Sequence, residues 1–195
     1  TIRKKIGLQY GEPLHVYVGA AAPQRGLDAM IEALAIAKEH HVALVVNPNA
    51  PYVLGLKEKA DGLGVASRLH IHPYVPEWYV STFVSDATSG VIPILKYPNH
   101  EISLVTKFFE YLHAKLPIIV SDVKTMAQEV NFRKNGLVFK ANDAEDLAKS
   151  FVGINRNRDK YVAAITPELL AEYSWEQQGD KLVAVHDFLA SKGKK

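Results

Sequence analysis

The chain has 195 residues, of which 48% are apolar and 23% charged, values typical of a single globular domain with a substantial core. A formal net charge of +2 is too small to indicate binding to nucleic acid or to a membrane surface, and the lack of cysteine excludes disulfides, thiolate catalysis and cysteine-ligated metal sites. We find no signal peptide and no apolar run long enough to span a bilayer, so we expect a cytoplasmic protein.

Strand-like and helix-like segments alternate after a polar opening, residues 1–12, which we interpret as a linker. Short apolar runs predict six strands, at residues 14–19, 41–47, 69–72, 88–95, 117–121 and 136–139. The spacing of apolar residues predicts helices at about residues 27–34, 52–63, 76–84, within 99–115, and at 123–130, 144–154, 167–173 and 175–190. Pro76 is expected to be the first residue of its helix, and Asn142 or Asp143 to cap the helix from residue 144.

This alternation predicts an α/β fold with a doubly wound parallel sheet of six strands, which is Rossmann-like. The strands are rich in valine, isoleucine and leucine with little alternation, as a sheet covered on both faces requires. Such sheets bind ligands at the carboxyl ends of their strands. We therefore expect a ligand crevice bordered by residues 19–25, 47–49, 72–75, 95–103 and 121–125.

The first of these loops, residues 19–26, reads GAAAPQRG. It has neither the lysine that ends a Walker A loop nor the glycine spacing of a dinucleotide-binding fingerprint. It does carry Arg25 at the start of a helix, where a guanidinium can hold a phosphate through two hydrogen bonds. The simpler interpretation is an arginine that faces solvent.

The most informative stretch runs from Asn99 to Asp122. A polar loop opens a helix here, and the unpaired N–H groups at a helix start form a ready site for a phosphate. Lys107 lies near that start, where the helix dipole disfavours a cation unless an anion is nearby. Glu110, about one turn further on, can accept hydrogen bonds from a ribose diol. The stretch thus predicts a nucleotide site.

The histidines do not indicate a metal. Glu110 and His113 have E-x-x-H spacing, but a di-iron site needs a second such motif and further glutamates in a helical bundle. His70 and His72 alternate along one strand and are interpreted as packing or rim residues. His40 and His41 are interpreted as a helix end, where positive charge is favourable.

The stretch from Asn99 resembles the donor-binding signature of retaining GT-B glycosyltransferases of the large sucrose-synthase-like family (glycosyltransferase group 1, family 4-like). That signature is a glutamate, seven residues, a second glutamate that begins "EA" or "EY", a small-residue turn and a proline before an apolar strand. Glu110 and Tyr111 match its second half closely. Glu101 is one residue too far away, because eight residues separate it from Glu110.

Three further segments are similar to the same family. Arg25–Gly26 matches a lysine–glycine pair of the first loop, although alanines occupy the place of an earlier arginine. Tyr74–Val75 matches a segment whose backbone meets the nucleobase. Ser174–Trp175 opens a helix like the family's C-terminal "S-W" helix, with Ser174 as a cap and Gln177 three residues on.

The resemblance implies that residues 13–195 are a nucleotide-sugar-binding domain, the C-terminal half of a GT-B enzyme without its N-terminal acceptor domain. It implies a glycosyltransferase of hexosyltransferase type that uses a nucleoside-diphosphate sugar, retains the anomeric configuration and needs no metal or other cofactor. The implied partners are the N-terminal GT-B domain and an acceptor (sugar, lipid or protein), with membrane association only through that missing half. We expect the chain by itself to fold but to transfer little or no sugar.

The resemblance also implies roles for single residues. Arg25, Lys107 and Glu101 are the catalytic candidates: the two cations would stabilise the departing phosphate, and Glu101 would contact sugar hydroxyls with Asn99 and His100. Glu110 would hold the ribose. The remaining candidates for donor binding are Gly19, Asn47, Tyr74 and Val75, together with the helix-start segment Ser103, Leu104, Val105 and Thr106.

Two other classes of function remain open. One is a catalytically idle GT-B half that serves as an interaction subunit, an alternative that the shifted glutamate and the absent first-loop arginine keep open. The other is a GT-B relative with different chemistry, such as a nucleotide-sugar epimerase.

Overall fold

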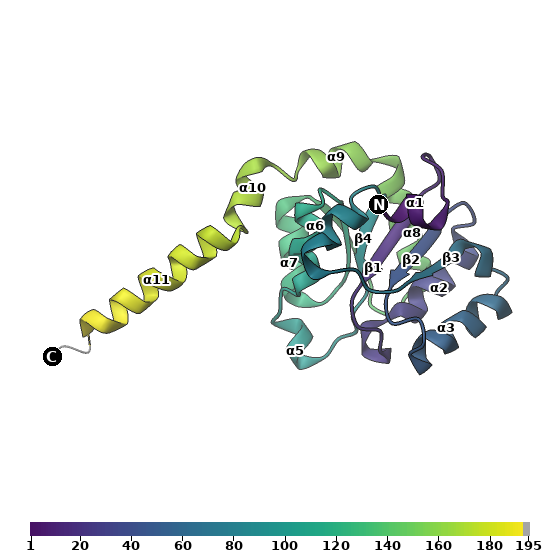
Figure 1. Cartoon of the computed structure of the whole chain (residues 1–195), viewed down its shortest axis with the longest axis horizontal. Helices are drawn as coiled ribbons and strands as arrows, with labels where there is room; N and C mark the ends of the chain where they lie inside the picture. Colours follow the sequence, from purple (N-terminus) through teal and green to yellow (C-terminus); the bar gives the residue numbers. More distant parts are fainter. Residues whose placement is uncertain (193–195) are drawn as a thin grey trace. The chain divides into compact units, whose positions relative to one another are not determined.

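The computed structural model describes residues 1–192, and Figure 1 shows its helices and strands. Six strands form one sheet: β1 Leu14–Val18, β2 His41–Val45, β3 Leu69–His72, β4 Ser89–Ile92, β5 Ile118–Ser121 and β6 Gly136–Phe139. Every pairing is parallel, and the strand order is β3-β2-β1-β4-β5-β6. The predicted α/β fold with a doubly wound sheet is confirmed. Its switch point lies between β1 and β4, where the strand order reverses.

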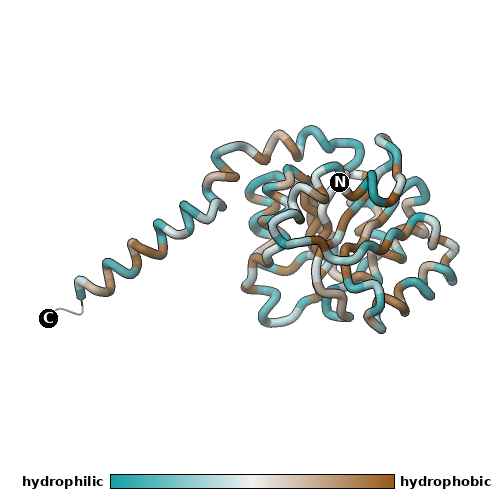
Figure 2. The backbone as a smooth tube through the Cα atoms, in the orientation of Figure 1, coloured by the Kyte–Doolittle hydropathy of each residue, from teal (hydrophilic) through white to brown (hydrophobic). Residues whose placement is uncertain are grey.

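Helices cover both faces of this sheet. Their bounds are α2 Leu27–Ile36, α3 Pro51–Gly62, α4 Val80–Val84, α5 Pro98–Glu101, α6 Thr106–His113, α7 Lys124–Arg133, α8 Ala144–Arg156 and α9 Arg158–Ala163. α2, α3 and α8 share a buried core with one sheet face, and α6 packs on the other through Tyr111, whose ring lies on Gly90. In Figure 2 the apolar residues gather in the strands, while the surrounding loops are mostly hydrophilic. No helix within residues 1–192 is both long and apolar enough to cross a membrane.

The six strands and most helices lie where the sequence predicts them, but α9 was not predicted and the helix expected within residues 99–115 is two helices, α5 and α6. The strands expected at residues 69–72 and 136–139 have the predicted bounds, and Asp143 caps α8 by accepting a hydrogen bond of 3.0 Å from the Asp146 N–H. Pro76 was wrongly expected to begin a helix: its extended ψ of 139° puts it before a 3-10 turn, Glu77–Tyr79, and α4 begins only at Val80. The strand expected at residues 88–95 ends at Ile92, before Pro93, which has no N–H for a strand ladder.

The chain divides into two compact units, Thr1–Ala164 and Ile165–Lys195, rather than one domain from residue 13. The second unit contains α10 Pro167–Glu172 and α11 Trp175–Lys192. Ser174 accepts a hydrogen bond of 3.2 Å from the Gln177 N–H, so the predicted cap is confirmed.

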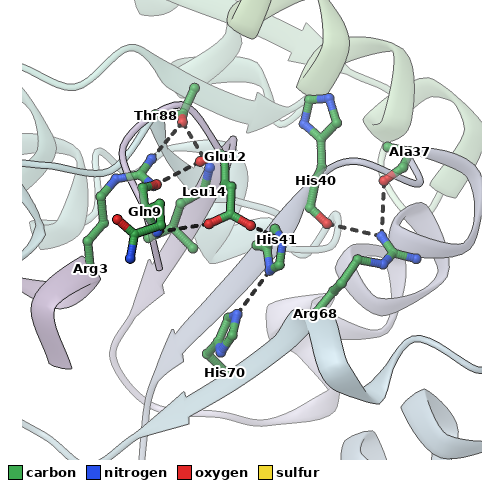
Figure 3. Close-up of polar contacts among 10 residues, drawn as sticks. All are labelled: Arg3, Gln9, Glu12, Leu14, Ala37, His40, His41, Arg68, His70 and Thr88. Atoms are coloured by element: carbon green, nitrogen blue, oxygen red, sulfur yellow. Dashed lines mark hydrogen bonds and ion pairs between the residues drawn. The ribbon is translucent and has the colours of Figure 1, made fainter. Parts of the chain in front are cut away.

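Residues 1–12 are not the linker that we expected but part of the first unit. They contain α1, Ile2–Ile6, in which Ile2 is fully buried. The Arg3 guanidinium, also buried, donates to the carbonyls of Asp86 at 2.6 Å, Gln9 at 2.9 Å and Glu12 at 2.8 Å. Figure 3 shows how Arg3 reaches these residues of the opening segment and Thr88, at the start of β4. The reason for the difference is therefore a long-range anchor that no local pattern indicates.

A buried chain of hydrogen bonds runs beneath the amino ends of β1 and β4. His15 bonds to the Ser89 hydroxyl through Nδ1 at 2.7 Å and to Nδ1 of His40 through Nε2 at 2.8 Å, and its ring stacks on Phe151 at 3.9 Å. Burial lowers the pKa of His15 well below its usual value and also lowers that of His40. The expected charged helix end at His40 is thus wrong, because that ring is buried and favoured in its neutral form.

The neighbouring pair, His41 and His70, joins ring to ring at 3.1 Å, and His41 lies 3.8 Å from the Glu12 carboxylate (Figure 3). Burial lowers the pKa of both rings. His72 packs on Phe83 with ring centroids 4.8 Å apart. The interpretation of His70 and His72 as packing or rim residues agrees with these contacts. Among the residues that the structure describes, no group of three or more histidines and acids is arranged to hold a metal ion.

We predict that acid destabilises the fold through His15. The pKa of His15 is lowered in the folded protein. Below about pH 6.5, His15 is therefore protonated in the unfolded chain but stays neutral in the folded chain. The free energy of unfolding should fall by about 1.4 kcal/mol per pH unit in that range from this residue alone. Urea unfolding at pH 7.5, 6 and 5 measures the slope. His15→Leu should make the slope shallower by about that amount, and His40, His41 and His70, whose pKa values burial also lowers, should account for what remains. His186→Gln, on α11, should keep the wild-type slope. Equal slopes in all three proteins would contradict the assignment.

Candidate functional site

The carboxyl edge of the sheet carries a cavity of about 460 Å³ beside the switch point between β1 and β4. The end of β1, the loop after β3 and the first turns of α6 surround it. The lining residues are Val18, Gly19, Tyr74, Val75, Pro76, Glu77, Val80, Thr106, Lys107 and Glu110. Six predicted donor-binding residues therefore meet here: Gly19, Tyr74, Val75, Thr106, Lys107 and Glu110.

The backbone leaves β1 into this cavity at Gly19, in a conformation with φ of +124° that favours glycine. A Cβ atom at this position would lie 3.5 Å from Nζ of Lys107. The Tyr17 hydroxyl donates to the Ala20 carbonyl at 2.7 Å and fixes the loop that follows. Lys107 can therefore approach the backbone of the first loop closely.

α6 is held by its buried face, which includes Phe108, Tyr111 and Leu112. The Tyr111 hydroxyl accepts from the Val18 N–H at 3.0 Å and donates to the Val16 carbonyl at 3.3 Å, so it bonds the helix to β1. No side chain caps the helix start at Val105. The first amides of α6, which carry the positive end of the helix dipole, open beside Thr106 and Lys107 at the cavity.

The Lys107 ammonium is the main cation of the cavity. Its Nζ lies 5.0 Å from the centre of the Tyr17 ring, a cation–π distance. Burial lowers the pKa of Lys107 to about 8, the nearby positive charge of Arg25 adds to this effect, and Glu110 opposes it. A cation kept out of water beside a second cation is electrostatically unsatisfied, and an anionic ligand would stabilise it.

Glu110 faces the same cavity one turn along α6. Burial raises the pKa of its carboxyl group, the Lys107 charge opposes this, and the Glu77 charge adds to it. The Ser81 hydroxyl donates to the Glu110 backbone carbonyl at 3.1 Å and joins α4 to α6. A half-buried carboxylate in this position has free lone pairs for hydroxyl donors.

A second hollow, of about 340 Å³, is lined by Gln24, Arg25, Tyr97, Asn99 and His100. It contains the predicted Arg25, Asn99 and His100, and the electrostatic effect of Arg25 on Lys107 links it to the first cavity. His100 lies 3.5 Å from the Arg25 guanidinium through Nε2 and 2.7 Å from the Leu95 carbonyl through Nδ1.

The structure does not bring the other predicted residues into either hollow. The Glu101 carboxylate accepts from the Lys124 N–H at 2.6 Å and so caps α7, and Asn47 accepts from the Asn49 N–H at 3.1 Å in a local turn. Ser103 donates to the Asn99 carbonyl at 2.5 Å. Leu104 and Val105 immediately precede α6 in the chain and line neither hollow.

Sequence reasoning missed Val18, Pro76, Glu77 and Val80, which line the first cavity. Glu77 comes two positions after the predicted Tyr74–Val75 segment, so an acidic residue in the loop that follows a strand was an available signal. The role of Glu77 in the site depends on Glu110, which is 33 positions later in the chain. The charge of Glu77 raises the pKa of the Glu110 carboxyl group.

Comparison with known proteins agrees with this geometry. The family model described as "Glycosyl transferases group 1" matches residues 1–166. The chain is 21% identical to the alpha-D-kanosaminyltransferase of Streptomyces kanamyceticus over 190 residues, which are 95% of this chain and 48% of that protein. Three curated relatives are each matched over 41 to 48% of their length, so the chain spans about half of them.

Two solved structures illustrate the likeness of fold. Sucrose-phosphate synthase from Thermosynechococcus elongatus superposes with a TM-score of 0.82 at 18% identity, over 98% of this chain and 49% of that one. HepE from Anabaena, solved in complex with UDP-glucose, superposes with a TM-score of 0.76 at 14% identity, over 93% of this chain and 51% of that one.

Proposed function

The chain belongs to the group 1 glycosyl transferases, and we propose that its first unit binds the nucleoside-diphosphate part of a sugar donor. One observation carries this proposal. Lys107, Glu110 and the uncapped start of α6 line a single cavity at the switch point of the sheet. That cavity offers a cation and free amides for a phosphate and a carboxylate for a hydroxyl-bearing group.

The diphosphate would lie against the start of α6, between Lys107 and Arg25. Neither cation has a carboxylate within ion-pair distance among the residues that the structure describes. Their mutual repulsion, visible in the lowered pKa of Lys107, would be relieved by the two negative charges of a diphosphate. Glu110 would accept hydrogen bonds from the ribose, and the base would lie along Tyr74 and Val75 at the edge of the cavity.

In transfer, the bond between the anomeric carbon and the diphosphate oxygen breaks while the acceptor oxygen bonds to that carbon, and the proton of the acceptor hydroxyl would pass to the departing diphosphate. Negative charge then grows on the diphosphate, and Arg25, Lys107 and the α6 amides would stabilise it electrostatically. Retention of configuration, departure without a metal, and an acceptor site on a further GT-B half are parts of the same proposal. The family match supports a transferase. The HepE structure, which has the same fold and was solved with UDP-glucose, supports a nucleotide-sugar donor.

We predict that Glu110→Ala weakens nucleoside-diphosphate binding by about tenfold to a hundredfold, because a charge-assisted hydrogen bond is worth about 1.5–3 kcal/mol. Glu110→Gln, which keeps one acceptor oxygen, should lose less. Calorimetric titration with UDP and GDP, and with the 2′-deoxy form of the one that binds, measures both effects. The wild type should prefer the ribonucleotide, and Glu110→Ala should lose that preference.

The matched control is Glu58→Ala, an exposed glutamate on α3, which should leave both affinities unchanged. A wild type that binds neither UDP nor GDP would overturn the proposed donor site. Equal affinity for ribo- and 2′-deoxynucleotide would remove Glu110 from the ribose site even though the family is established.

A further inference from the structure

The two ring nitrogens of His100 have different partners. Nδ1 lies 2.7 Å from the Leu95 carbonyl oxygen, which can only accept, so Nδ1 carries the proton. In the neutral imidazole Nε2 is then an acceptor, and it faces Nη1 of Arg25 at 3.5 Å, which can only donate. The two contacts thus agree on one tautomer, and the ring, 5% exposed, has little freedom to leave it.

The backbone next to Arg25 is hydrogen-bonded to the same residue, Leu95. The Leu95 N–H donates to the Gln24 carbonyl at 3.0 Å. Gly26, with φ of +68°, lies so close to the Pro93 carbonyl that a Cβ atom would meet that oxygen at 2.0 Å. The first loop and His100 are therefore both fixed to the segment after β4: the loop bonds to the Leu95 N–H, and His100 bonds to the Leu95 carbonyl.

His100 makes the one side-chain hydrogen bond of Arg25 within the part of the chain that the structure describes. An arginine without a carboxylate partner and without this bond would sample many rotamers, and ordering it upon binding would reduce affinity. A neutral acceptor can orient a guanidinium without neutralising its charge, which leaves that charge for a ligand.

We propose that His100 is a positioning residue that holds the Arg25 guanidinium for the diphosphate, rather than a residue that contacts the donor sugar. The proposal rests on the proposed donor site. It assigns to His100 a neutral role in which Nδ1–H anchors the ring to Leu95 and Nε2 orients Arg25.

Two substitutions separate the two nitrogens. His100→Asn keeps a donor near Nδ1 and removes the acceptor for Arg25, whereas the longer His100→Gln carries an amide oxygen to about the position of Nε2. Each is titrated with UDP and GDP and with uridine and guanosine, alone and combined with Arg25→Ala. We expect His100→Asn to weaken diphosphate binding about threefold to tenfold, to leave nucleoside binding unchanged, and to be rescued by His100→Gln. In the Arg25→Ala background it should have no further effect.

The positioning role would be overturned, while the donor site stands, if His100→Asn weakened nucleoside and diphosphate binding equally. It would also be overturned if His100→Asn caused the same loss of diphosphate affinity in the Arg25→Ala background as in the wild type. Binding of neither diphosphate to the wild type would instead overturn the donor site itself. The tautomer of His100 can also be measured without any variant, by ¹⁵N–¹H NMR of its imidazole in the wild type. We expect the proton on Nδ1. A proton on Nε2 alone would overturn the assignment, and this measurement holds even if His100→Asn does not fold.

Discussion

Lys107→Met should reduce the affinity for a nucleoside diphosphate by about tenfold to a hundredfold, because it removes a charge-assisted contact of about 1.5–3 kcal/mol. Methionine keeps most of the aliphatic length that is packed against Tyr17, so the loss should reflect the charge. Calorimetry with UDP and GDP at pH 7 measures it. Lys149→Met, at an exposed position on α8, is the matched control and should bind as the wild type does.

The same residue predicts the pH dependence of binding. Because the pKa of Lys107 in the free protein is about 8, its ammonium is present below that pH and is lost above it. Diphosphate affinity of the wild type should therefore fall as pH rises above 8, by at most about tenfold per pH unit. Lys107→Met should have a flat profile over this range. A wild-type profile that stays flat up to pH 10 would contradict the buried cation as a phosphate ligand.

Gly90→Ala should destabilise the fold by about 3 kcal/mol or more, which lowers the unfolding temperature by about 6 to 12 °C. The added Cβ would lie 2.2 Å from the ring of Tyr111. That ring is fully buried, and its hydroxyl bonds to the backbone of β1 at Val16 and Val18, so it cannot move aside without breaking both bonds. Thermal unfolding and urea unfolding measure the effect.

Gly62→Ala, at the end of α3, is the control for this substitution. A Cβ atom there meets nothing within 4 Å, and the position needs no left-handed backbone. We expect a change of less than about 1 kcal/mol, in the stabilising direction, because alanine has less freedom in the unfolded chain. Equal unfolding temperatures for the two variants would contradict the close contact between β4 and α6.

Much of the candidate site could be predicted because it follows from parallel topology. Gly19 and Tyr74 belong to loops that each follow a strand, and Lys107 lies in the first turn of α6, between β4 and β5. The carboxyl ends of parallel strands meet at one edge. Apolar runs identify the strands, and the dipole of α6 makes a lysine near its start informative. These arguments need only local spacing and one rule of topology.

Other predictions failed where the partner of a side chain is distant in sequence. Glu101 matched a sugar-binding glutamate in the motif, but its carboxylate caps α7 through Lys124, 23 residues away. Arg3 belongs to the segment that we expected to be a linker, but it is buried against Asp86, 83 residues away. His40 reads as a helix end, but His15 and Phe151 enclose its ring in a neutral stack.

The strands, most of the helices, the parallel sheet and the group of residues at its carboxyl edge were thus predictable, because each depends on neighbours within a few positions or on chain order. Which polar groups remain available to a ligand became clear from the folded chain. Lys107 and Glu110 line a cavity, whereas Glu101 is used by a helix start and His100 by Leu95 and Arg25. The physical reason is that a donor or acceptor is occupied by whichever partner folding brings within about 3 Å, and sequence spacing does not specify that partner.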